Sequence, residues 1–192
     1  MFSLKRHLRD AFFAIVMLGA AWMVVGHVCE VSSAADKLDQ NAPVADERPA
    51  DKSKLVVHLY FSDKENSFLS AEQRTLLYSK DVVEFGKTIL EALIQGPREG
   101  LMRTIPSATT LHSLYVTQDG TAYVDLAATI KDAHPGGVHS EQMTIFSIVN
   151  SLILNIPEID AVKILIDGSE SVTLAGHIDL RFPFRANMLL IR

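Results

Sequence analysis

Two short groups of histidine and acidic residues contain the side chains from which catalytic or metal-binding sites are often built. His134 and His139 flank a Pro-Gly-Gly-Val segment, and Asp132 lies just before them. Two imidazoles and a carboxylate can together hold a transition metal. The spacing matches no strong metal-binding motif, however, and paired histidines on a glycine-rich loop are most simply solvated turn residues. We therefore predict no metal site.

The second group is His177 and Asp179, which alternate along a possible strand and would share one face, where they could hydrogen-bond. Nucleophilic catalysis would instead need a serine or cysteine beside a base on a rigid turn. The chain has no Gly-x-Ser-x-Gly motif, and its single cysteine, Cys29, lies at the end of an apolar segment. We predict that the protein is not an enzyme, has no catalytic, cofactor-binding or metal-binding residues, and needs no cofactor. Ligand-binding residues stay unassigned.

The composition limits the function classes further. The chain has 192 residues, 48% of them hydrophobic, and a formal net charge of −5. This length fits one domain beside a targeting segment, and an acidic chain is poorly suited to bind nucleic acid. One cysteine excludes an internal disulfide framework.

The amino terminus predicts a membrane segment. Lys5, Arg6 and Arg9 precede residues 11–29, which carry no formal charge at neutral pH. As a helix this run would reach roughly 28 Å, close to the hydrocarbon thickness of a bilayer. The basic residues keep the start cytoplasmic. We predict that residues 1–29 anchor the chain in the cytoplasmic membrane by a single pass, with the remainder extracytoplasmic.

Cleavage is the alternative for this segment. Ser33 and Ala35 are small residues suitably placed before a cut at Asp36, which would make the protein secreted or periplasmic. The long apolar run favours an uncleaved anchor. Lipidation of Cys29 is disfavoured because the large Val28 precedes it. Residues 30–53 read as a polar linker, and residues 54–192 as the folded domain.

The first half of the folded domain begins with strand patterns. Residues 55–61 are rich in β-branched and aromatic types and predict a strand, and residues 73–78 predict a second strand, with a helix as the alternative. Asp81 and Glu84 form the pattern of a capping box, which starts an amphipathic helix that ends at Gly96.

Residues 111–126 then predict a hairpin. A two-residue loop would place Asp125 opposite Leu114 on the apolar face. A three-residue loop ending at Gly120 instead pairs Leu114 with Val124 and Val116 with Ala122, and keeps one face apolar. We choose the second register.

The last part of the domain predicts a second helix, capped by Ser140 and ended before Pro157, in which Asn150 would make a structural hydrogen bond. Residues 162–166 predict a strand, and residues 173–180 a short irregular one. The elements together predict an α+β fold: a two-layer sandwich of a mostly antiparallel sheet with two amphipathic helices on one face. The apolar residues of the carboxy-terminal tail either dock on the core or bind a partner; they are Phe182, Phe184 and residues 188–191.

Six segments, in this order and spacing, are together specific for one known domain. They are VVHLYF at 56–61, ALIQGP at 92–97, IP at 105–106, DGTAYVDL at 119–126, IVNSLILNIPEIDAVKILIDG at 148–168 and LAGHIDL at 174–180. Over residues 55–183 the chain resembles the GerMN domain family. The resemblance implies an extracytoplasmic, membrane-attached domain without established enzymatic activity, and a fold akin to the ring-building motif of secretion and sporulation complexes.

Several residues match motif positions of that family, and each has a sufficient structural role as a helix stop, a turn or a packing residue. They are Gly96, Pro97, Gly120, Asp125, Asn150, Gly168 and Gly176. The family usually has threonine where Ser151 stands.

The sequence thus predicts a membrane-anchored, non-catalytic interaction or assembly module of the cell envelope. Its partners would be envelope proteins or a second copy of the chain, and it would use a sheet edge or an apolar patch. The alternative is an accessory domain that binds peptidoglycan and supports amidase-type wall remodelling. The only tryptophan, Trp22, lies in the membrane segment, so a sugar platform would need tyrosine or phenylalanine.

Overall fold

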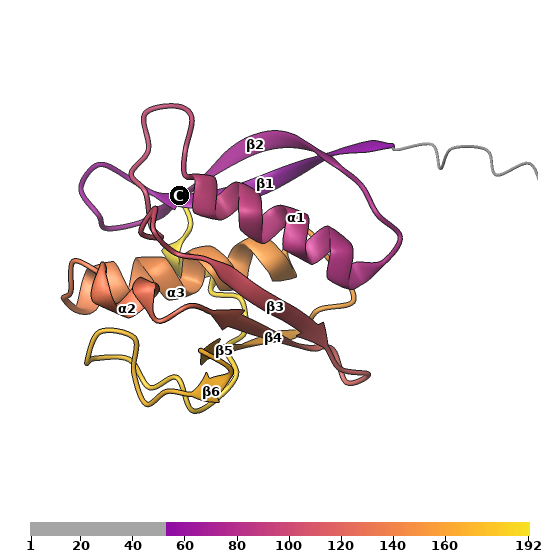
Figure 1. The fold of residues 1–192 in the computed structure, drawn as a ribbon. Coiled ribbons are helices and arrows are strands. Elements are labelled where there is room, and N and C mark those ends of the chain that lie inside the picture. Colours follow the sequence, from indigo (N-terminus) through magenta and orange to yellow (C-terminus); the bar gives the residue numbers. More distant parts are fainter. Residues whose placement is uncertain (1–52) are drawn as a thin grey trace, which may run out of the picture. The chain divides into compact units, whose positions relative to one another are not determined.

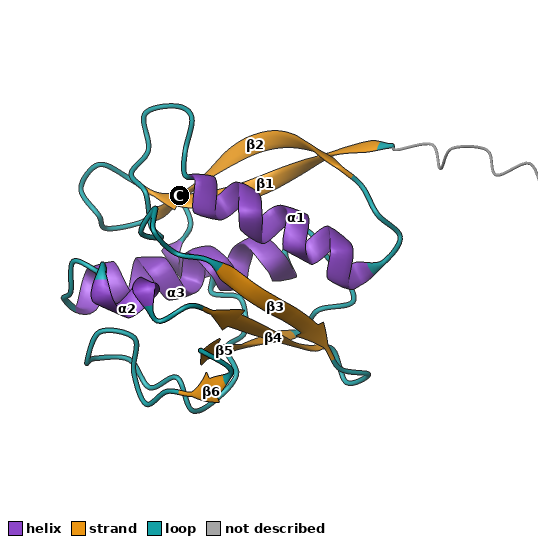
Figure 2. Cartoon of the chain, in the orientation of Figure 1, coloured by secondary structure: helices purple, strands orange, loops and turns teal. Residues whose placement is uncertain are grey.

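The computed structural model describes residues 53–192, so the predictions for the membrane segment, Cys29 and most of the linker lie outside the described residues. Figures 1 and 2 show the elements in chain order. They are β1 Lys54–Ser62, β2 Leu69–Leu77, α1 Val82–Gln95, β3 Leu111–Val116, β4 Thr121–Leu126, α2 Thr129–Asp132, α3 Val138–Ile153, β5 Ala161–Ile166, β6 Ser169–Glu170 and the 3-10 turn η1 Met188–Leu190. No helix within residues 53–192 has the length and apolar character needed to cross a bilayer.

The α+β class is confirmed, and the strands divide between two sheets. β1 and β2 form an antiparallel hairpin, while β3, β4, β5 and β6 form a mixed sheet in that order. Figure 1 shows α1 and α3 between the hairpin and the mixed sheet, and both helices contact β1. Among the described residues, one large cluster of buried apolar side chains runs through these layers, and a smaller one is formed by Tyr60, Leu69 and Met143.

The pairing of β4 with β5 is parallel and the other three strand pairs are antiparallel, as the prediction of mostly antiparallel pairing allows. Parallel neighbours need a long crossover connection, and here the chain passes through α2 and α3 between them. The predicted register of the β3–β4 hairpin is confirmed, because Leu114 pairs with Val124 and Val116 with Ala122. Gly120 has a φ of 80°, as a left-handed turn position requires.

The predicted start of α1 is confirmed at its amino-terminal cap. The Asp81 side chain accepts hydrogen bonds from the backbone N–H groups of Val83 (2.8 Å) and Glu84 (3.1 Å). The reciprocal half of a capping box is absent, because the Glu84 carboxylate pairs with Lys87 (2.8 Å). The helix ends at Gly96, whose φ is 89°.

The second long helix starts earlier than predicted. Gly137, with a φ of 84°, occupies the cap position of α3 and provides no side-chain cap. Ser140 therefore is not the cap; it lies in the first turn, and its hydroxyl accepts a hydrogen bond from the Asn66 side chain (3.1 Å). A glycine can take the position because it adopts this backbone angle without a steric cost.

The carboxy-terminal third is irregular. Residues 173–180 form no strand and contribute one isolated bridge, between Thr173 and Asp179. The tail docks on the domain: Ile191 bridges Leu69, and the backbone of Phe184 exchanges two hydrogen bonds with Val162 (2.7 and 2.8 Å). Three of its apolar side chains stay exposed, namely Phe182, Met188 and Leu189.

Candidate interaction surfaces

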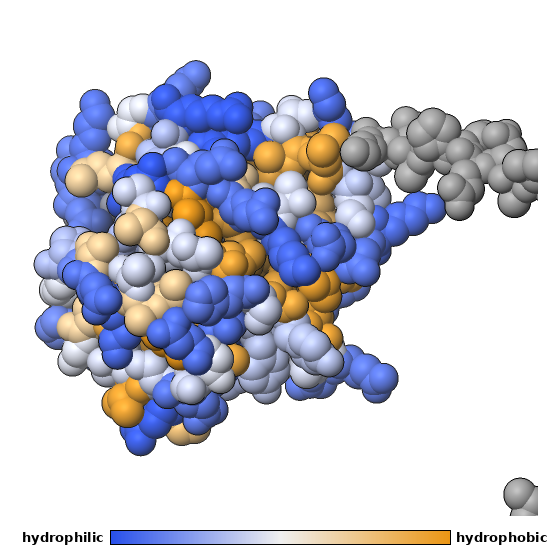
Figure 3. Space-filling view, in the orientation of Figure 1, coloured by the Kyte–Doolittle hydropathy of each residue, from blue (hydrophilic) through white to orange (hydrophobic). Residues whose placement is uncertain are grey.

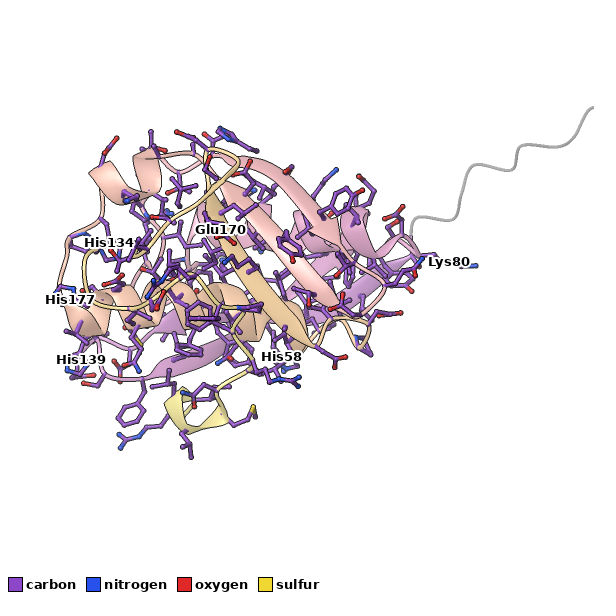
Figure 4. The ribbon with its side chains drawn as sticks, turned by 90° about the horizontal axis from the view of Figure 1, so that it is seen from below. His58, Lys80, His134, His139, Glu170 and His177 are labelled. Atoms are coloured by element: carbon purple, nitrogen blue, oxygen red, sulfur yellow. The ribbon has the colours of Figure 1, made fainter. Side chains whose placement is uncertain are left out.

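In the first candidate group, His134 is held by hydrogen bonds within the fold and His139 is exposed. Figure 4 shows His134, His139 and His177 at one end of the domain. His134 Nδ1 accepts the Gly136 N–H (3.0 Å), so Nε2 carries the proton and donates to the Thr144 hydroxyl (3.0 Å). Burial lowers the pKa of His134 below its ordinary value, which keeps the ring neutral. His139 and Asp132 are exposed, and residues 53–192 contain no group of three potential ligands that could hold a metal ion.

The second candidate pair is not brought together, because each member has another partner. His177 Nδ1 lies 3.1 Å from a carboxylate oxygen of Glu141. Asp179 forms a two-oxygen contact with the Arg181 guanidinium, which lowers the pKa of the Asp179 carboxyl to about 2.

Glu141 is a fully buried carboxylate that the sequence predictions missed. It accepts backbone N–H bonds from Leu174 (2.9 Å), Ala175 (2.8 Å) and His177 (2.9 Å). Burial alone would raise its pKa, but these amide donors outweigh burial and hold the pKa below the ordinary value of 4.5. Glu141 therefore ties the loop after β6 to α3, and it is a structural group.

A row of polar side chains on α3 and just beyond its end closes the outer edge of β1 at His58 and Tyr60. Asn155 bonds both backbone groups of His58 (2.9 and 2.8 Å). The Tyr60 N–H donates to the Ser151 hydroxyl (3.0 Å), and the Ser147 hydroxyl donates to the Tyr60 carbonyl (2.7 Å). Ser62, the next residue along this edge, exchanges two backbone bonds with Met102. From His58 to Ser62, therefore, no further strand can pair with this edge, whereas the outward backbone groups of Lys54 and Val56 at its start have no such partner within residues 53–192.

The opposite side of the hairpin is partly covered by the tail. The Arg192 N–H donates to the Leu69 carbonyl (2.9 Å), and Arg192 stacks over Phe68. Asn150 anchors this tail from α3, because its side chain exchanges two bonds with the backbone of Asn187 (2.9 and 3.2 Å). The predicted structural role of Asn150 is confirmed.

The outer edge of β3 is open. The Thr117 N–H donates to the Thr121 carbonyl across the hairpin, so antiparallel alternation turns the backbone groups of Leu114 and Val116 away from β4. Within residues 53–192, no backbone or side-chain group bonds to these outward groups. Beside this edge, Tyr115 is 70% exposed and pairs across strands with Tyr123.

A groove lies at the end of the domain opposite His134, His139 and His177, where the β1–β2 hairpin opens. It holds about 540 Å³ and is lined by the start of β1, the turn after β2, the first turn of α1 and the segment after α3. Figure 3 shows apolar surface at this end of the hairpin and beside the first turn of α1. Such a volume lies within the roughly 300–1,000 Å³ that is usual for binding clefts.

Signals for the missed features are present in the sequence but are indirect. Glu141 shares a helical face with Ile145, Ile148 and Leu152, and a charge on an apolar face indicates a buried ionic contact. Ser147, Ser151 and Asn155 recur every fourth residue, which places them along one side of the helix. The groove has no such signal, because distant segments form it.

The fold resembles three solved structures. A candidate lipoprotein from Clostridium perfringens is 28% identical with a TM-score of 0.50, over 69% of this chain and 88% of that one. The tandem GerMN domains of the sporulation protein GerM from Bacillus subtilis are 25% identical with a TM-score of 0.57, over 68% of this chain and 46% of that one. The first GerMN domain of the same protein is 24% identical with a TM-score of 0.56, over 70% of this chain and 98% of that one.

No curated protein matches the chain. The family described as "Germane: Sporulation and spore germination" matches residues 58–172, a range that runs from β1 to just beyond β6. With that match over more than half of its length, and with the fold of GerMN domains, the chain belongs to the Germane family and contains a GerMN-type domain.

Proposed function

We propose that this protein is a non-catalytic interaction module of the bacterial cell envelope. Residues 11–29 hold it in the cytoplasmic membrane, and the GerMN-type domain binds envelope proteins on the extracytoplasmic side. The likeness to a candidate lipoprotein supports an envelope location. The engagement of His134, Glu141 and His177 in internal hydrogen bonds supports a role in which shape, not a reactive group, matters.

The open edge of β3 carries this proposal. Two outward-facing residues, Leu114 and Val116, present backbone donors and acceptors that a partner strand can pair with. Such strand addition is a common mode of recognition. Along β1, residues on and just after α3 already bond the outward groups of His58 and Tyr60, so only the start of that strand, at Lys54 and Val56, is open.

The test removes one outward donor from the edge. Val116→Pro deletes the N–H that faces away from β4, whereas Val116→Thr keeps the N–H and the side-chain size. Full-length proteins would be crosslinked in cells, purified and compared by mass spectrometry. We expect envelope partners with the native chain and Val116→Thr, and their loss with Val116→Pro. Equal recovery from all three would contradict the proposal for this edge.

The membrane anchor has its own test. An intact-mass measurement of the mature protein distinguishes a chain that retains residues 1–35 from one that starts at Asp36. We expect the uncleaved chain in the membrane fraction. A mature start at Asp36 would replace the tether with a secreted or periplasmic module and leave the domain's binding role to be tested separately.

Peptidoglycan binding is the second candidate, favoured by the tyrosine pair on the mixed sheet. Tyr115 and Tyr123 lie directly opposite each other, and a sugar ring can stack on such aromatic surface. Sedimentation with purified wall material would test it. Retention of the native protein and release of Tyr115→Ser would support the wall-binding function, whereas no sedimentation of either would exclude it.

A further inference from the structure

The groove at the open end of the β1–β2 hairpin is a second surface, separate from the β3 edge. Its floor is buried and apolar: Phe85 and Ile156 lie beneath it, and Tyr78 packs edge-on against Phe85 with ring centroids 5.2 Å apart. Its rim is polar, and contains Lys54, Lys80, Asn155 and Glu158.

Apolar side chains are exposed at the open end of the β1–β2 hairpin. Four of them are between 41% and 54% exposed: Leu55, Val56, Leu77 and Tyr78. Single exposed apolar residues are ordinary on a protein surface, but a group beside a cleft marks a binding site. Leu55 and Tyr78 line the groove itself, whereas the alternation of side chains along the strands places Val56 and Leu77 on the other face of the hairpin, so an occupant of the groove would cover Leu55 and Tyr78.

The charges at the rim indicate the chemistry of the occupant. Lys54 and Lys80 contribute two positive charges against the single negative charge of Glu158. The domain from residue 54 to 192 has twelve lysines and arginines against sixteen acidic residues, so the groove lining, with two lysines against one glutamate, is more positive than the domain as a whole. Asp81 and Asp160 lie close to the lining residues in the chain. Figure 4 shows Lys80 projecting from this end, opposite the end with the three histidines. Charge complementarity therefore favours an anionic, apolar occupant.

A protein segment fits this chemistry better than an anionic bilayer does. The tip of the β3–β4 hairpin lies at the same end, since Gly120 adjoins Asp160 and the backbone of Glu158. A broad anionic surface would meet Asp160 and Asp119 as well as the lysines, whereas a narrow segment in the groove meets mainly the lysines. We propose that the groove binds a short apolar segment of a partner protein whose carboxylates contact Lys54 and Lys80. This proposal rests on the function as an interaction module and adds a second binding surface to it.

The test uses residues 47–192, which form one compact unit that contains the whole described core. The probe is a short peptide of leucine and glutamate with blocked ends, titrated into the isotopically labelled domain and followed by amide NMR shifts. A peptide with lysine in place of glutamate is the charge control. We expect the glutamate peptide to shift the amides of Leu55, Tyr78 and Val82, and the lysine peptide to bind at least about tenfold more weakly.

Matched variants separate local charge from total charge. Lys54→Glu with Lys80→Glu should weaken binding of the glutamate peptide about tenfold. Lys64→Glu with Lys131→Glu makes the same change in net charge away from the groove and should leave binding unchanged. Both lysine pairs are exposed, so the folded domain should tolerate either change.

Three results would overturn the inference: no groove shifts up to the solubility limit of the peptide, equal binding of both peptides, or shifts centred on Leu114 and Val116. Binding of the domain to phosphatidylglycerol vesicles, lost with Lys54→Glu and Lys80→Glu, would assign the groove to a membrane surface and also overturn it. Failure here is distinguishable from failure of the proposed function, which the Val116→Pro crosslinking tests on the full-length chain.

Discussion

β1 and β3 each have one edge that pairs with no neighbouring strand. The two edges differ in whether other parts of the domain bond their outward backbone groups. Along β1, side chains of Ser147, Ser151 and Asn155 bond the outward backbone groups of His58 and Tyr60, and only the start of the strand is left without such contacts. Along β3, the outward groups of Leu114 and Val116 meet no such partners within residues 53–192. A helix with small polar residues at the right spacing can thus replace a strand, and its absence at β3 leaves that edge available for binding.

The largest loss of stability should follow substitution of Glu141, which lies on the same helix, α3, that bonds the edge of β1. Glu141→Leu removes a buried carboxylate that accepts three backbone N–H bonds, and leaves those donors unpaired. We expect a loss of about 3 kcal/mol in the free energy of unfolding, measured by urea denaturation. A change below about 0.5 kcal/mol would show that Glu141 does not hold the loop after β6.

The next largest loss of stability should follow removal of a hydrogen bond between α3 and the edge of β1. Ser147→Ala removes the hydroxyl that donates to the Tyr60 carbonyl, and should cost about 1–2 kcal/mol. Ser171→Ala, which removes a half-buried hydroxyl in a loop, is the control and should cost less. If the two substitutions are equivalent, the polar row on α3 contributes nothing special to the edge of β1.

A pH dependence should accompany the Glu141 contacts. Because the native pKa of Glu141 lies below its ordinary value of 4.5, its contribution is fully present above that pH and disappears as the pH falls through the lowered native pKa. Glu141→Gln should therefore reduce the loss of stability between neutral and acidic pH. Thermal unfolding across that range measures it, and an unchanged slope would argue that other carboxylates dominate.

The smallest change in stability should follow substitution of an exposed residue on β3. Tyr115 is largely exposed, so Tyr115→Ser should change the free energy of unfolding by less than about 0.5 kcal/mol. If this substitution leaves the stability intact but lowers the recovery of crosslinked partners, Tyr115 contributes to binding and not to folding. A large loss of stability instead would mean that the tyrosine pair is a structural element of the sheet.

The sequence predicted those features that depend on local pattern. The β3–β4 register followed from keeping one face apolar, and the start of α1 followed from Asp81 as its cap. The cap of α3 was predicted at Ser140 and lies at Gly137, because a glycine with a positive φ gives little sequence signal. The parallel pairing of β4 and β5 could have been inferred from the helix between them.

Contacts between residues far apart in the chain could not be predicted from the sequence. Nothing local indicates that Ser151 would meet Tyr60, ninety-one residues away, or that His177 would bond Glu141 and not Asp179. The groove is formed by the ends of four segments, and only the packing of the hairpin on α1 and α3 brings Leu55 beside Tyr78 and Ile156. The negative predictions for catalysis and metal binding remain predictions.

Amide hydrogen exchange of the free protein compares the two strand edges most directly. The N–H groups of His58 and Tyr60 are donated to Asn155 and Ser151, so they should exchange slowly, whereas those of Leu114 and Val116 should exchange much faster. Equal protection of the four amides in the monomeric protein would mean that the β3 edge is already closed, and would contradict its role as the binding surface.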